Sequence, residues 1–362
     1  MADEAVGFPE SVSMAVGGMV GGGIFAVLGV VAATAGTLSW FAFVVAGVVA
    51  ASAGYSFNRL NGLLDEASGP IAFVERFTGR SKLAGMVGWT FIFGYVGTMA
   101  MYAYAFGGYF VELTGTQAVG GLALRPLVSV LVVVSFVGLN SAGAHASGRT
   151  EDVLVALKVG ILLVFGVGGL YYGLRQGKLT TGFAAFGTGP VVAAAISFVA
   201  FEGWELLFFD QDTIADPKRT TRRAVYASIA IATGLYVMVA VVTTNLVSTA
   251  AIRQHAETAL AIAAQPFLGQ VGFVLISLAA LFSTGSAINA TLFSASRLST
   301  QLATENFLPE GIRREGGEPV RALVVLGGLT ATFTFFGSLS GITSFASLAF
   351  ITIFGLVSWL AF

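Results

Sequence analysis

The feature that most constrains this chain is a series of long apolar runs separated by short loops. A helix needs about 20 consecutive, mostly apolar residues to cross the hydrocarbon core of a bilayer, and such runs recur along the whole sequence. The chain has 362 residues, of which 56% are hydrophobic and only 10% are charged, and its mean hydropathy is +0.86. These values are typical of a polytopic membrane protein and unlike those of a soluble domain.

We predict an all-α membrane protein with ten transmembrane helices in a single transmembrane domain, residues 1–362. Long continuous apolar runs favour helices over a β-barrel, whose strands would show short alternating patterns. The acidic start, "MADEAVGFPE", lacks the basic residues of a cleavable signal peptide, so the first run is expected to remain as a span. The predicted spans are 11–33, 38–57, 83–113, 124–141, 153–172, 191–209, 224–247, 271–292, 322–337 and 342–362.

Basic residues predict the orientation of these spans. Most lysines and arginines fall in the loops that follow the even-numbered spans, whereas the opposite side carries only Arg125, Arg175, Lys178 and Arg253. Because basic loops are retained in the cytoplasm, we expect both termini on the cytoplasmic side of the cell membrane.

Composition also excludes several classes of function. A net charge of −1 gives no basic footprint for nucleic acid. The chain has no cysteine and two histidines, which leaves no thiolate or histidine cluster for a metal, so we expect neither a metal nor a cofactor. The sequence contains no His-Glu-x-x-His or Gly-x-Ser-x-Gly motif that would indicate a membrane-embedded enzyme. It also shows no soluble signalling domain that would indicate a sensor. An enzyme and a sensor are therefore remote alternatives.

Three charged residues lie inside predicted spans and away from their ends. A charge at a helix centre costs about 2.5–3.5 kcal/mol, so each of the three is a functional candidate. Glu202 and Glu205 occur three residues apart in "FEGWE" and share one helical face. They are expected to face a cavity, although a structural pair bonded to neighbouring helices is the alternative. Lys158 lies about six residues into the fifth span, and it either extends back to the interface or meets the polar cluster "LFSTGSAINA" of the eighth span.

The first span contains the glycine-rich stretch "AVGGMVGGGIFAVLG". The small-xxx-small pairs in it suit close helix packing. Three successive glycines, Gly21, Gly22 and Gly23, cost about 1 kcal/mol each relative to alanine, so we predict a break in the helix there. On this interpretation packing explains only Gly17 and Gly18.

Matching breakers in the first and sixth spans indicate two halves of five spans each, about residues 11–173 and 190–362, in opposite topology. Interrupted segments at corresponding positions of two halves point to a transporter built from inverted repeats, with helices 1 and 6 broken at mid-membrane and the substrate bound at the breaks.

The sequence resembles the amino acid–polyamine–organocation superfamily of permeases, which adopt the leucine-transporter fold. The resemblance rests on "GGMVGGGIF", on "FVAFEGWELLFFDQDTIADPKRTTRRAV" and on "FSASRLSTQLATENFLPEGIRR", which occur in the family's order. Glu205 fits the family's glutamate at the break, whereas Glu202 stands where many relatives have an apolar residue.

The resemblance implies roles for two groups of residues. The amides of the three central glycines would bind a substrate carboxylate, carbonyl groups at the breaks would bind its ammonium, and aromatic residues would form gates or pocket walls. The predicted substrate-binding residues are Met19, Gly21, Gly22, Gly23, Val199, Ala200, Phe201, Glu202, Trp204 and Glu205. Certain relatives use a lysine of the fifth helix in place of a sodium ion, and the corresponding residues are Lys158, Ser283, Thr284, Ser286, Gly17 and Val20.

The expected function is therefore secondary active transport of amino acids by alternating access, coupled to protons through Lys158. Sodium-coupled transport, and an exchanger of polyamines or cationic amino acids with the same fold, are the alternatives, and the extra acid Glu202 favours a cationic substrate slightly.

Overall fold

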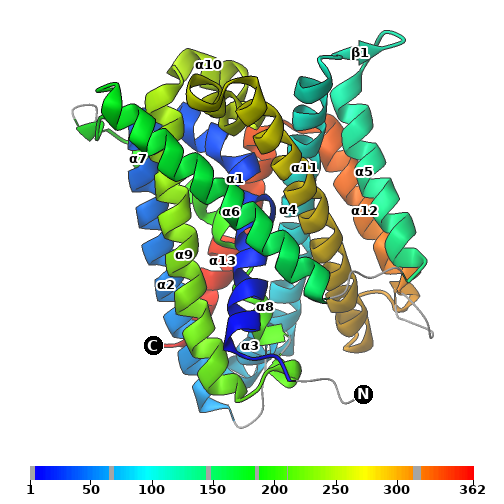
Figure 1. Cartoon of the computed structure of the whole chain (residues 1–362). Coiled ribbons are helices and arrows are strands. Elements are labelled where there is room, and N and C mark those ends of the chain that lie inside the picture. The colour runs from blue at the N-terminus through cyan, green and yellow to red at the C-terminus, as the bar shows by residue number, and fades with distance from the viewer. Residues whose placement is uncertain (1–4, 65–68, 144–147, 184–186, 210, 313–318) are drawn as a thin grey trace.

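The computed structural model describes residues 5–64, 69–143, 148–183, 187–209, 211–312 and 319–362, with the side chains of residues 148–152 and 310 left aside. The described chain is almost entirely helical (Figure 1), as the apolar runs predict. Its one small sheet is a hairpin of β1 (Ala118–Val119) and β2 (Leu122–Ala123), paired in antiparallel register with Val119 opposite Leu122. This hairpin joins α4 to α5 at one end of the molecule.

Ten long helical segments correspond to the predicted spans. In the first half these are α1 (Phe8–Ala35), α2 (Ser39–Leu63), α4 (Ser81–Thr114), α5 (Leu124–Ser141) and α6 (Gly148–Arg175), with a 3₁₀ turn η1 (Gly36–Leu38) and the short α3 (Pro70–Thr78) between them. In the second half they are α7 (Gly189–Ser197) with η3 (Phe198–Phe201) and α8 (Leu206–Phe209), then α9 (Pro217–Leu246), α11 (Ala259–Thr304), α12 (Val320–Phe336) and α13 (Leu339–Leu360). Short elements complete the chain: η4 (Gln211–Thr213), α10 (Thr249–Gln254), η5 (Ala256–Thr258) and η6 (Glu310–Ile312).

Length and hydropathy identify 8 stretches able to cross a membrane, and the first of them, Phe8–Leu63, contains both α1 and α2. The apolar helix α12 is shorter. The main differences from the predicted bounds are extensions: α9 begins at Pro217, and α11 continues to Thr304 and includes a kink at Gly269, where φ is 60°. Polar or charged residues in these extensions hid them from a search for apolar runs.

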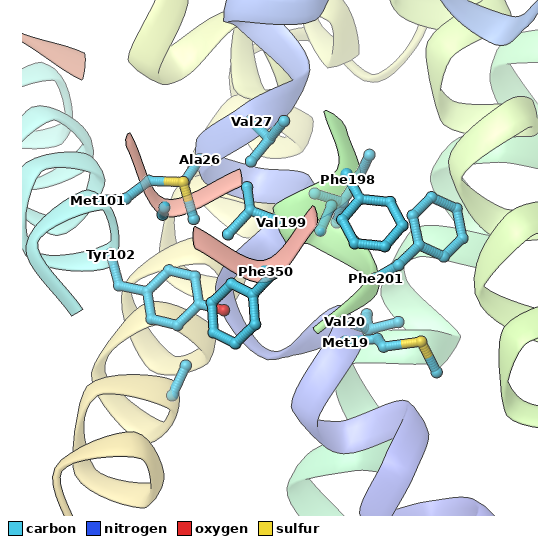
Figure 2. Close-up of a cluster of buried hydrophobic side chains, with 14 of the residues drawn as sticks. Met19, Val20, Ala26, Val27, Met101, Tyr102, Phe198, Val199, Phe201 and Phe350 are labelled. Carbon is cyan, nitrogen blue, oxygen red and sulfur yellow. The ribbon is translucent and has the colours of Figure 1, made fainter. Parts of the chain in front are cut away.

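Helix α1 is the centre of the molecule (Figure 1) and packs against α6, α7, α9 and α11. Its residues from Met19 to Val31 are buried on all sides. Figure 2 shows apolar side chains from α1, α4, η3 and α13 gathered around its middle, among them Val20, Tyr102, Phe201 and Phe350.

The predicted break in the first span is wrong, because α1 is helical from Phe8 through Gly21–Gly23 to Ala35. The glycines instead permit close packing. A Cβ atom on Gly18 would lie 2.8 Å from the Cα of Gly203, and one on Gly23 would lie 2.9 Å from the Cα of Ala200. One on Gly22 would overlap the ring of Tyr102. Tertiary packing offsets the poor helix propensity of these residues.

The chain leaves the helix in the sixth span. After η3, residues Glu202 to Glu205 form a turn before α8 begins. Gly203 has φ of +131°, a conformation that residues with a side chain rarely adopt. A Cβ atom there would also lie 2.6 Å from the backbone nitrogen of Met19. Two independent reasons therefore require glycine at position 203: its backbone conformation, and the short distance to α1.

Both ends of the described chain lie at one end of the molecule (Figure 1). The guanidinium carbon of Arg223 lies 4.9 Å from the ring centre of Phe8. The guanidinium carbon of Arg59 lies 5.7 Å from the ring centre of Phe362. The described chain ends thus lie beside basic residues of loops that the sequence predicts to be cytoplasmic.

Candidate functional site

A cavity of about 780 Å³ lies between α1, α4, α6, α11 and the turn that follows η3. Its inner end is formed by the buried side chains of Tyr102, Lys158 and Glu202, and by the partly buried Gly18. It extends along α1 and α11 to exposed residues such as Arg297, at the end of the molecule that holds the N-terminus. Ligand sites in proteins are concave and mostly apolar, with a few polar groups and volumes of about 300–1,000 Å³, so this cavity has the size and character of a small-molecule site.

Lys158 on α6 points into the protein and not back to a membrane interface. Only 6% of its surface is exposed, and its Nζ donates a hydrogen bond of 3.2 Å to the carbonyl oxygen of Gly17 on α1. Nζ would also lie 3.8 Å from a Cβ atom placed on Gly21. The lysine therefore joins α6 to the middle of α1 at the cavity wall.

Two hydroxyl groups of α11 that were assigned to the same junction have different positions. The Oγ of Ser283 lies within hydrogen-bond reach of the carbonyl oxygens of Val20, at 3.1 Å, and of Gly21, and its single proton can be donated to either one. Thr284 instead donates to Ala280 in its own helix, at 2.7 Å. Ser286 lines the cavity. Lys158 and Ser283 thus bond neighbouring carbonyl groups of α1 from two different helices.

Glu202 also faces the cavity and is 6% exposed. Its Oε2 lies 2.6 Å from the hydroxyl oxygen of Thr98 on α4. Glu205 has a different environment, because it is fully buried and its Oε2 accepts the backbone N–H of Gly203 at 2.7 Å. Although they are three residues apart, one carboxyl group lines the cavity and the other supports the turn.

Tyr236 on α9 was not predicted, and it bonds two of the carbonyl groups assigned to the substrate. Its buried hydroxyl lies 2.7 Å from the carbonyl oxygen of Met19 on α1 and 2.8 Å from that of Ala200 in η3. The carbonyl of Val199 accepts the backbone N–H of Glu202 at 3.2 Å. In this conformation these three carbonyl groups have partners within the protein.

The aromatic residues proposed as gates lie outside the cavity wall. Trp204 is fully buried, and its ring centre lies 5.0–5.1 Å from those of Phe57 and Phe354. Phe201 is also fully buried, 5.3 Å from the ring of Tyr236. Both side chains pack against neighbouring helices.

The structure therefore brings only some of the predicted residues to the cavity. Its described lining includes Glu202, Lys158, Gly17 and Ser286. The predicted residues that pack beside it are Met19, Val20, Gly21, Gly22, Gly23, Val199, Ala200, Phe201, Trp204, Glu205, Ser283 and Thr284. Sequence reasoning missed Thr98, Tyr102 and Tyr236, whose only signal was a hydroxyl group inside an apolar span.

The helical spans identify a polytopic membrane protein, and the cavity between them has the size of a small-molecule site. The sequence matches the amino acid permease family over residues 6–362. The chain belongs to this amino acid permease family and is a membrane transport protein, not an enzyme.

Three relatives illustrate the similarity. An uncharacterized protein of Methanocaldococcus jannaschii is 32% identical over 95% of this chain and 79% of the relative. The inner membrane transport protein YbaT of Escherichia coli is 31% identical over 85% of this chain and 71% of the relative. The Asc-type amino acid transporter 1 of Mus musculus is 23% identical over 94% of this chain and 67% of the relative.

Proposed function

We propose that the chain is a secondary active transporter that moves amino acids across the cytoplasmic membrane by alternating access and is driven by protons. The observation that carries this proposal is the bond from Lys158 to Gly17 at the wall of the cavity. An ammonium group that loses its proton no longer carries the charge that strengthens this bond. Deprotonation would therefore loosen α1 from α6 and favour movement of one part of the protein against the other.

In this proposal the cavity is the substrate site in a conformation open toward the cytoplasm. The two halves, residues 11–173 and 190–362, form an inverted repeat of five spans each, and both termini are cytoplasmic. The basic residues beside both chain ends support this orientation. Because α1 is continuous, we do not assign the substrate carboxylate to the amides of Gly21–Gly23.

A second candidate function is an exchanger of cationic amino acids or polyamines. The observation that favours it is the carboxyl group of Glu202 at the inner end of the cavity. A relative, the vacuolar cationic amino acid transporter 2 of Arabidopsis thaliana, is 26% identical over 98% of this chain and 58% of its own length. An exchanger would accelerate uptake when substrate is preloaded but would not respond to a proton gradient alone.

The test is uptake of labelled L-alanine, L-lysine, L-glutamate and putrescine into liposomes that contain the purified protein, with a proton gradient, a sodium gradient or neither. One pH unit is worth about 1.4 kcal/mol, which supports about tenfold accumulation when one proton moves with each neutral substrate. We expect the unmodified protein to accumulate a neutral amino acid under the proton gradient.

Lys158→Ala is expected to bring the accumulation ratio to about one while exchange persists, because the bond to Gly17 is absent at every pH. The matched control is Lys82→Ala, which removes an exposed lysine at the start of α4 and should accumulate substrate normally. Accumulation by Lys158→Ala under the proton gradient would refute the coupling role, and accumulation under a sodium gradient alone would refute proton coupling altogether.

A further inference from the structure

In the contact between Glu202 and Thr98, the hydroxyl group of Thr98 has an oxygen acceptor on each side. The Oγ1 of Thr98 lies 2.6 Å from Oε2 of Glu202 and 3.0 Å from the carbonyl oxygen of Gly94, one turn earlier in α4. Both distances suit an O–H···O hydrogen bond. A hydroxyl group has a single proton, so it can donate to only one of these oxygens at a time.

This geometry satisfies Glu202 in either protonation state. When the carboxyl group is ionised, Thr98 donates its proton to Oε2. When the carboxyl group is protonated, it donates to Oγ1 of Thr98, and the hydroxyl turns to donate to Gly94. The switch requires rotation about one C–O bond and no displacement of heavy atoms. A proton can therefore enter or leave with little rearrangement of the protein.

The carboxyl group of Glu202 bonds the hydroxyl group of Thr98, and among the described residues no salt bridge to Glu202 is present. The titratable groups near it are Glu205 in the same turn, Lys158 of α6 across the cavity, and three phenols: Tyr95 and Tyr102 of α4 and Tyr236 of α9.

The neighbouring part of α1 contributes no titratable group, since it approaches the turn with Gly18. Farther out, Glu10 and Arg297 line the outer part of the cavity. A buried carboxyl group beside a second carboxyl group and without a bound cation is more stable when one of them carries a proton.

We propose that Glu202 is a proton-binding site of the cavity, separate from Lys158, and that the ammonium group of an entering amino acid or amine displaces its proton. The carboxylic O–H bond breaks, the proton passes through the open cavity to water, and the carboxylate pairs with the substrate ammonium. One positive charge enters the site as one leaves. This inference rests on the second candidate function, the exchanger. It assumes an ammonium-bearing substrate, and a proton displaced in each cycle would cancel one that moves with the substrate through Lys158.

The experiment measures proton release on binding. Purified protein in weakly buffered detergent solution, with a pH indicator dye, is mixed with L-alanine, L-lysine or putrescine, and binding of the same probe is measured in parallel. We expect the unmodified protein to release about one proton for each probe molecule bound.

Glu202→Gln is expected to release no proton, because a carboxamide can still hydrogen bond to Thr98 but does not titrate. The matched control is Glu112→Gln, which changes a half-exposed carboxyl group at the outer end of α4 and should leave proton release unaltered. If Glu202→Gln does not fold, Thr98→Val provides the second test. It removes the donor that stabilises the ionised form, so release should require a higher pH than in the unmodified protein.

Equal proton release by Glu202→Gln and the unmodified protein would overturn the inference, as would binding by the unmodified protein without release. Transport in liposomes distinguishes these outcomes from failure of the proposed function. Transport of an amino acid without the predicted release refutes only the role of Glu202. If no probe is bound or transported, the proposed substrate class is wrong and the role of Glu202 falls with it.

Discussion

The close packing of Gly22 against Tyr102 gives the most direct test of how α1 is built. In Gly22→Ala the new methyl group would lie 2.7 Å from Cγ of Tyr102 and closer still to two other ring atoms. The ring is 2% exposed and lies among helices of the core, with one side at the cavity, so the methyl group can be accommodated only by moving the ring. The substitution therefore sets improved helix propensity against steric overlap.

The two contributions have opposite signs and can be compared. Alanine in place of glycine inside a helix stabilises by about 1 kcal/mol. Overpacking a buried site costs about 1–3 kcal/mol. We therefore expect Gly22→Ala to lower the free energy of unfolding by about 1 kcal/mol. Gly234→Ala is the matched control: this glycine lies inside α9 with no atom near its missing side chain, so the same change should stabilise by about 1 kcal/mol.

The assay is urea- or heat-induced unfolding of the purified variants in detergent, together with the double variant Gly22→Ala/Tyr102→Ala. Removing the ring makes space for the methyl group, so the double variant should be more stable than the sum of the single effects by about 1–2 kcal/mol. Additive effects of the two substitutions would refute the packing explanation. If Gly22→Ala binds substrate more weakly while its stability is unchanged, the result would instead support the prediction that the amide of Gly22 binds the substrate.

Two further predictions concern the junction between α1 and the turn that follows η3. Tyr236→Phe retains the ring but leaves the carbonyl groups of Met19 and Ala200 without their phenol partner, so it should lower the free energy of unfolding by about 1–2 kcal/mol, measured by denaturation; an unchanged midpoint would argue against this bridge. Gly203→Ala combines backbone strain of about 1–3 kcal/mol with overlap of similar cost against α1, so it should reduce folded protein in size-exclusion chromatography severely. A Gly203→Ala variant that elutes normally at full yield would contradict the assigned backbone conformation.

The transmembrane architecture was predictable because each span satisfies the bilayer by itself. An apolar run of sufficient length must fold as a helix in lipid, whatever the rest of the chain does. The span predicted at 124–141 coincides with α5. The predicted helix bounds were wrong where a helix continues beyond the apolar run. The span predicted from residue 224 is part of α9, which begins at Pro217 with the polar sequence "PKRTTRR" that hydropathy does not detect.

The candidate site was only partly predictable. Lys158 and Glu202 were found because a charge inside an apolar span is costly and therefore informative. Their neighbours Thr98, Tyr102 and Tyr236 were not found, because a single hydroxyl group in a membrane helix most often bonds its own backbone. The threonine does so as well, and its second contact, with Glu202, spans 104 residues of sequence.

The glycine-rich stretch shows where local reasoning ends. Composition alone shows that residues 15–29 are apolar and poor in helix propensity, as expected of a segment in the membrane. Their continuous helix depends on packing, because the atoms that occupy the space beside the glycines belong to Tyr102, Ala200 and Gly203, far away in the chain. Helix propensity is a property of single residues, whereas close packing depends on pairs of surfaces that meet only after the chain has folded.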